Sequence, residues 1–103
     1  MATGEKYNGY NNYETWMIAL WIDNDQYYQE AVHELAEQHA DDDGDHDLGG
    51  YSSAIKDFVE EMPDVAGAIE KGGIVADMVN STLSSVDWYE LAEMYMKEYQ
   101  ENQ

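Results

Sequence analysis

The fold of this chain is decided by one apolar stretch, residues 11–23, which reads NNYETWMIALWID. Asn11 is predicted to be the N-cap of a helix. Glu14, three residues later, is placed to complete a capping box, in which its carboxylate accepts from the Asn11 backbone N–H. Apolar side chains then surround most of a helix over residues 13–23, which would lie at the centre of a core or against a second subunit. A short buried strand is the competing interpretation, because short apolar runs are ambiguous by periodicity. We favour the helix.

Working outward, turn and cap signals divide the rest of the chain into further short helices. Asn24 or Asp25 can cap a second helix, and Ser52 or Ser53 a third, which ends before Pro63. Ser84 and Asp87 form another capping-box candidate. The predicted helices are 13–23, 26–40, 52–62, 74–83 and 86–101, with a loop over 41–50 and a short helical turn over 63–70.

These elements predict an all-α fold, a compact single-domain bundle of about four to five short helices over residues 1–103. Residues 1–10 are polar and rich in Gly and Tyr, which predicts a flexible N-terminal arm without the pattern of a signal peptide. The longest apolar run, residues 16–22, is too short to span a bilayer. We therefore expect a cytoplasmic protein.

The charge balance is the most unusual property of the sequence. The chain has 23 acidic residues against four Lys and no Arg, so its formal net charge is −19. Repulsion on this scale opposes compaction, so such a chain either lives in high salt or uses its field. Direct binding to nucleic acid or to anionic membranes is disfavoured, because both rely on Lys and Arg.

The acids gather where lysine is missing, in the interval between Lys6 and Lys56. Four of them share one face of the second predicted helix, spread over ~17 Å, which is one charge every ~5–6 Å against a phosphate every ~3.4 Å along one DNA strand. The acids of the following loop and of the last helix bring the field closer to that of a duplex. The candidate partner-binding residues are Glu30, Glu34, Glu37, Asp41, Asp42, Asp43, Asp45, Asp47, Glu90 and Glu93.

The spacing of residues gives little support for metal binding or catalysis. Placing Gly44 at the sixth position of an EF-hand loop puts His39 at the first and Gly50 at the twelfth, where oxygen ligands are needed. The three histidines match no zinc pattern, and no serine lies in a nucleophile elbow. We expect no enzyme, metal site or cofactor. The alternatives are a divalent-cation-binding module using residues 41–47, a halophilic housekeeping domain, or a merely solubilising surface.

The aromatic residues divide into two expected groups. Trp16, Trp21 and Trp88 fall at helical spacing and are expected in the core. A second group could supply contact residues, since tyrosine is enriched at interface hot spots; it comprises Tyr7, Tyr10, Tyr27 and Tyr51.

Residues 7–16, YNGYNNYETW, and 19–25, ALWIDND, resemble small uncharacterised proteins of phages, plasmids and archaeal viruses, and residues 86–93 resemble their C-terminal element. In character the chain is also similar to acidic anti-restriction and anti-CRISPR proteins, which imitate DNA. This resemblance implies a viral or mobile-element anti-defence protein that presents a DNA-like acidic surface in the host cytoplasm. The implied partner is the basic nucleic-acid-binding surface of a host defence protein. A homodimer through the apolar helix 13–23 is a further expectation.

Overall fold

The computed structural model describes residues 7–41 and 46–101, and these form six α-helices. In chain order they are α1 (Tyr13–Asp23), α2 (Gln26–His39), α3 (Leu48–Glu60), α4 (Pro63–Lys71), α5 (Gly73–Ser85) and α6 (Trp88–Glu101). The all-α prediction is confirmed, but the number of helices is six instead of four to five. Residues 63–70, expected as a short turn, belong to a full helix, because Pro63 suits the first helical position.

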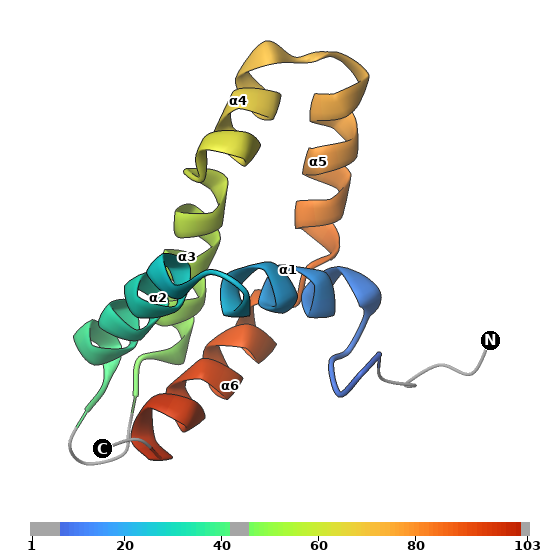
Figure 1. The fold of residues 1–103 in the computed structure, drawn as a ribbon. Coiled ribbons are helices and arrows are strands. Elements are labelled where there is room, and N and C mark those ends of the chain that lie inside the picture. Colours follow the sequence, from blue (N-terminus) through green and yellow to red (C-terminus); the bar gives the residue numbers. More distant parts are fainter. Residues whose placement is uncertain (1–6, 42–45, 102–103) are drawn as a thin grey trace.

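Four helices enclose the core and two project from it. Figure 1 shows α1, α2, α3 and α6 packed together, with α4 continuing upward from α3 and α5 returning toward α1. Gly72 and Gly73 make the turn between α4 and α5. Both have positive φ angles (74° and 81°), which residues other than glycine rarely adopt. The most deeply buried side chains include Ile22, Val32, Tyr51, Ile55, Val59, Leu91 and Met96.

The predicted caps of α1, α3 and the last helix are wrong, and that of α2 is confirmed. The cap of α1 is Asn12 instead of Asn11, and the predicted box with Glu14 is not formed. Asp25 caps α2 as expected, accepting from the backbone N–H groups of Tyr27 and Tyr28 at 2.9 and 3.3 Å. Ser84, expected to cap the last helix, lies in the final turn of α5 and donates to the Ser81 carbonyl.

Helix α3 begins at Leu48, before both of its candidate caps, Ser52 and Ser53. Asp47 is the actual N-cap and accepts from the Gly50 N–H at 2.9 Å. A Cβ at Gly50 would overlap the Asp47 carboxylate, so glycine leaves room for this cap. Ser52 lies inside the helix and donates to the Gly49 carbonyl at 2.8 Å. The glycines that suggested a loop therefore form the first turn of the helix.

Two aromatic predictions are also corrected. Trp21, expected in the core, is 65% exposed, because α1 turns Thr15, Ala19 and Ile22 inward and Trp21 away from them. Tyr51, expected at a contact surface, is fully buried, and its hydroxyl donates to the Val32 carbonyl at 2.9 Å. The apolar circumference of α1 is thus only partly covered by the chain itself.

The starts of α1 and α6 are joined through their capping residues. Asn12 Oδ1 accepts from the backbone N–H and the hydroxyl of Thr15, at 2.8 and 2.6 Å. The oxygen of that hydroxyl accepts from the Asp87 N–H at 2.8 Å, and Asp87 Oδ1 in turn caps α6 by accepting from the Glu90 N–H at 3.0 Å. In a capping box a glutamate side chain accepts from the backbone N–H of the N-cap residue, and here the Thr15 hydroxyl does this for Asp87.

Asn11 and Glu90 extend this network. The Asn11 N–H donates to Glu90 Oε1 at 2.8 Å, and the Asn11 side-chain amide donates to Asp87 Oδ2 at 2.5 Å. The stretches 7–16 and 86–93, which carry the family resemblance, therefore meet in space. Glu90, a candidate for partner binding, is only 8% exposed and its carboxylate is engaged within the fold. Glu90 therefore helps to join the starts of α1 and α6.

The Thr15 hydroxyl should be the most sensitive atom of this network. Thr15→Val keeps the shape of the side chain but leaves the Asp87 N–H without its partner, because Thr15 is fully buried. We expect a loss of about 2–3 kcal/mol in the free energy of unfolding, measured by urea denaturation. Thr15→Ser is the control: it keeps both bonds and deletes one methyl group, which costs about 1 kcal/mol. Equal losses in the two variants would contradict the capping role.

Candidate functional site: the acidic groove between α2 and α6

A groove of about 650 Å³ follows the outer face of α2 and is closed on one side by α6. Three of the ten candidate residues, Glu30, Glu34 and Glu37, line it together. The aromatic rings of Tyr27 and Tyr99 lie beside these carboxylates. The groove therefore combines a row of negative charges with two phenol rings.

The position of the carboxylates follows from the amphipathic pattern of α2. Val32 and Ala36 are fully buried and fix the rotation of the helix on the core. Residues 30, 34 and 37, spaced four and three apart, then share the opposite, exposed face. Three acids of the predicted stripe, Glu30, Glu34 and Glu37, are thus on one face, but the fourth, Asp41, lies beyond the end of α2 at His39.

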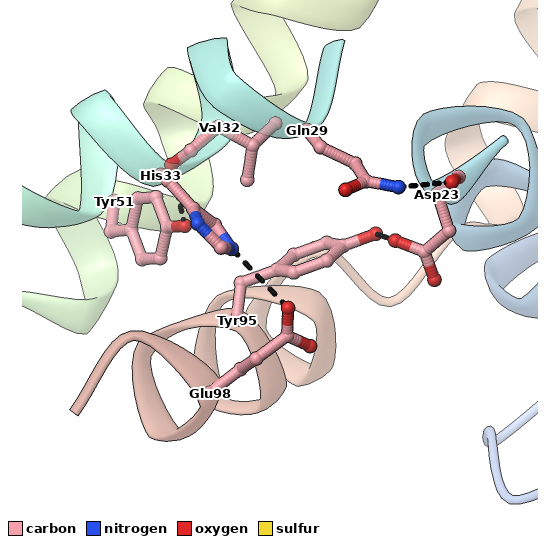
Figure 2. Close-up of polar contacts among 7 residues, drawn as sticks. All are labelled: Asp23, Gln29, Val32, His33, Tyr51, Tyr95 and Glu98. Carbon is pink, nitrogen blue, oxygen red and sulfur yellow. Dashed lines mark hydrogen bonds and ion pairs between the residues drawn. The ribbon is translucent and has the colours of Figure 1, made fainter. Parts of the chain in front are cut away.

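Polar contacts at the edge of the groove tie α2 to α1 and α6, as Figure 2 shows. His33 Nε2 lies within hydrogen-bond distance of Glu98 Oε1, at 3.2 Å. The Tyr95 hydroxyl donates to Asp23 Oδ1 at 3.1 Å, and the Gln29 side-chain amide donates to the Asp23 carbonyl. No lysine is among the groove-lining residues, and the one histidine among them, His33, is paired with Glu98.

The remaining candidates lie elsewhere. Asp41 and Asp47 are exposed; the Asp41 N–H donates to His46 Nδ1 at 2.8 Å, and Asp47 caps α3. Glu93 is exposed on α6 but is not among the groove-lining residues. The remaining three, Asp42, Asp43 and Asp45, lie outside the described residues, and the cation-binding alternative at residues 41–47 depends on them. Elsewhere in the described chain, no group of three or more His, Asp or Glu side chains is placed to hold a metal ion.

Three groove features were not among the predicted site residues. His33 of α2 and Tyr99 of α6 line the groove, and Glu98 of α6 lies at its edge, 3.2 Å from His33. Tyr99 follows the buried Tyr95 by four residues, a spacing that alone predicts the inward face of the helix. Its presence beside α2 depends on how the two helices pack, which no local pattern contains.

Burial shifts the titration of several groups around this junction. The pKa of Asp23 is raised, first by burial and then by the charge of Glu98, although the Tyr95 hydrogen bond and His33 oppose the shift. Burial is also the main cause of the raised pKa values of Tyr10, Tyr51 and Tyr95, with Asp23 adding to the shifts of Tyr10 and Tyr95. The hydroxyls of Tyr51 and Tyr95 are protonated donors, to the Val32 carbonyl and to Asp23.

The fold and this groove define a small acidic helical protein with an anionic surface groove. A family model described as "Family of unknown function (DUF7249)" matches residues 3–102, so the chain belongs to this family. No curated protein and no solved structure matches the chain. Among the helices that the structure describes, none combines the length and apolarity needed to cross a bilayer.

The buried tyrosines predict alkaline unfolding. Raised pKa values in the folded state mean that the unfolded chain releases these protons first, so their contribution to stability is complete below about pH 10 and is lost as the pH rises further. For Tyr51 and Tyr95, which are almost fully buried, the free energy of unfolding should fall by about 2–3 kcal/mol per pH unit above pH 10.

Tyrosinate absorbance, followed together with helical circular dichroism, measures this effect. We expect part of the tyrosinate absorbance to appear only as the helical signal is lost. Tyr51→Phe and Tyr95→Phe should each reduce the absorbance that appears on unfolding. Complete ionisation of all nine tyrosines with the helical signal intact would contradict the assignment.

Proposed function

We propose that this protein is an inhibitory binding protein of a virus or mobile element, which docks the acidic groove of α2 and α6 on the basic nucleic-acid-binding surface of a host defence enzyme. The observation that supports the proposal is the row of exposed carboxylates, Glu30, Glu34 and Glu37, on one face of a helix anchored in the core. The groove-lining residues include no lysine to neutralise them.

The electrostatics of the groove suit a partner that normally holds phosphates. Glu37 lies seven helical steps after Glu30, which spreads their three charges over ~10 Å, one every ~5 Å. The ~10 Å length of the row is close to the Debye length of ~8 Å at physiological salt, so salt screens the three charges from one another only in part. A nearby cationic surface therefore interacts with all three at once. Together with the net charge of −19, the row should accelerate association with a basic channel and make binding strongly salt-dependent.

Tyr27 and Tyr99 give the same groove a means of contacting arginine. The guanidinium group stacks on aromatic faces while it donates to carboxylates, and tyrosine is enriched among residues that dominate binding energy. A Lys- and Arg-lined channel offers such groups at close spacing. The resemblance to acidic anti-restriction and anti-CRISPR proteins makes a restriction or CRISPR nuclease, encountered in the host cytoplasm, the first target to test.

The test is a pull-down from host lysate with the wild-type chain, followed by competition with duplex DNA. We expect recovery of a nucleic-acid enzyme that the duplex displaces. The triple variant Glu30→Gln, Glu34→Gln, Glu37→Gln should then bind that enzyme about tenfold or more weakly, as expected for the loss of three charges of ~0.5–1 kcal/mol each.

A charge-matched control separates the groove from the overall field. Asp57→Asn, Glu70→Gln and Asp77→Asn remove three exposed carboxylates that do not line the groove. This control should bind within about threefold of wild type, because it removes the same net charge outside the groove. Equal losses in both triple variants, or recovery of proteins that bind neither DNA nor RNA, would overturn the proposal.

A further inference from the structure

A second groove, of about 490 Å³, lies where α1 and α2 meet the junction of α3 and α4. Its lining is largely apolar and includes Met17, Trp21, Tyr28, Met62 and Val65. Its volume lies within the range of ordinary ligand-binding clefts. Nothing in the acidic groove described above requires these residues.

Trp21 is the most telling residue of this lining. It is 65% exposed although it lies between the buried residues Ala19 and Ile22 on α1. A large aromatic side chain held at the edge of an apolar groove is typical of the residues that anchor protein interfaces. Met17 and Met62 add flexible thioether side chains, which adapt to the shape of an inserted apolar group.

We propose that this groove binds the apolar face of a basic amphipathic helix of the partner protein. The choice of occupant rests on charge complementarity. Asp25 and Asp64 are exposed at the groove, so a helix whose apolar stripe is flanked by Lys or Arg would pair its charges with them. A second copy of this chain would instead bring another charge of −19 to the same place.

The two grooves adjoin at the start of α2. Tyr27 lines the acidic groove and Tyr28 lines the apolar one, and their ring centroids are 5.8 Å apart. A basic helix seated against Trp21 can therefore direct cationic side chains past Tyr27 toward Glu30. The inference rests on the proposed function in one respect, that the partner is cationic; it adds the apolar anchor and the helical form of the contact.

The test uses a fluorescent synthetic helix of Leu and Lys, about five turns long, with Leu at the i, i+3, i+4 and i+7 positions. The comparison probe is a scrambled peptide of the same composition, which carries the same charge without an apolar face. Fluorescence anisotropy is measured at raised ionic strength, which weakens purely electrostatic attraction. We expect the amphipathic probe to bind wild type about tenfold more tightly than the scrambled one.

Two matched variants locate the contact. Trp21→Ser should reduce the affinity for the amphipathic probe about tenfold. Ile74→Ser removes a side chain that is 76% exposed on α5 and outside the groove, and it should leave the affinity unchanged. Equal binding of the two probes, or equal effects of the two variants, would overturn the inference. Self-association of the wild type that Trp21→Ser abolishes would also overturn it, because the occupant would then be a second copy.

The Glu30, Glu34 and Glu37 triple variant distinguishes this inference from the proposed function. At low salt it should weaken both probes by a similar factor, because it removes charge and no apolar contact. If it has no effect while Trp21→Ser still does, the acidic groove fails as a binding surface and the apolar groove stands. The reverse result supports the acidic groove and overturns the helix-binding inference.

Discussion

The reciprocal capping of α1 and α6 is the constraint on which the arrangement of the other helices depends. Thr15 is buried between Asn12 and Asp87. Its hydroxyl donates to Asn12, the cap of α1, and accepts from the N–H of Asp87, the cap of α6. Because both helix starts are fixed by one side chain, α1 cannot rotate about its axis without breaking the start of α6. Ala19 and Ile22 must then face the core, and Trp21 must face outward. The exposed side of α1 is thus set by hydrogen bonds as well as by hydrophobicity.

The same constraint determines where binding surfaces can form. With α1 fixed, Asp23 at its end meets Tyr95 of α6 and Gln29 of α2, which sets α2 against α6. The face of α2 that remains outside is the one that carries the carboxylates. Its neighbouring edge, at Tyr28, closes the apolar groove with α1. Both grooves therefore lie on rigid helices, and little ordering of the backbone would be needed on binding.

What the sequence could predict is the part of the structure that depends on neighbours along one helix. The helical class, the bounds of α1 and α2 to within a residue, and the stripe from Glu30 to Glu37 all follow from local periodicity. Glu90 could not be placed, because its partner is the Asn11 N–H, 79 positions away. Nor could Tyr99 at the acidic groove or the exposure of Trp21, which depend on packing between helices. The prediction of the α3 cap was wrong for a local reason. Asp47 and Ser52 are both favourable N-cap residues, and Asp47 is the cap because Gly50 leaves room for its carboxylate.

A row of like charges on a well-packed helix also stores free energy that a partner can release. Val32 and Ala36 hold α2 on the core, so Glu30, Glu34 and Glu37 cannot move apart to relieve their repulsion. In the free protein no lysine lines the groove to neutralise them. A basic surface that meets all three removes this repulsion at the same time as it forms new ion pairs, and each carboxylate is already in position when it arrives. The repulsion that weakens the free chain therefore becomes part of the driving force for binding, and it favours a multiply charged partner over a single cation.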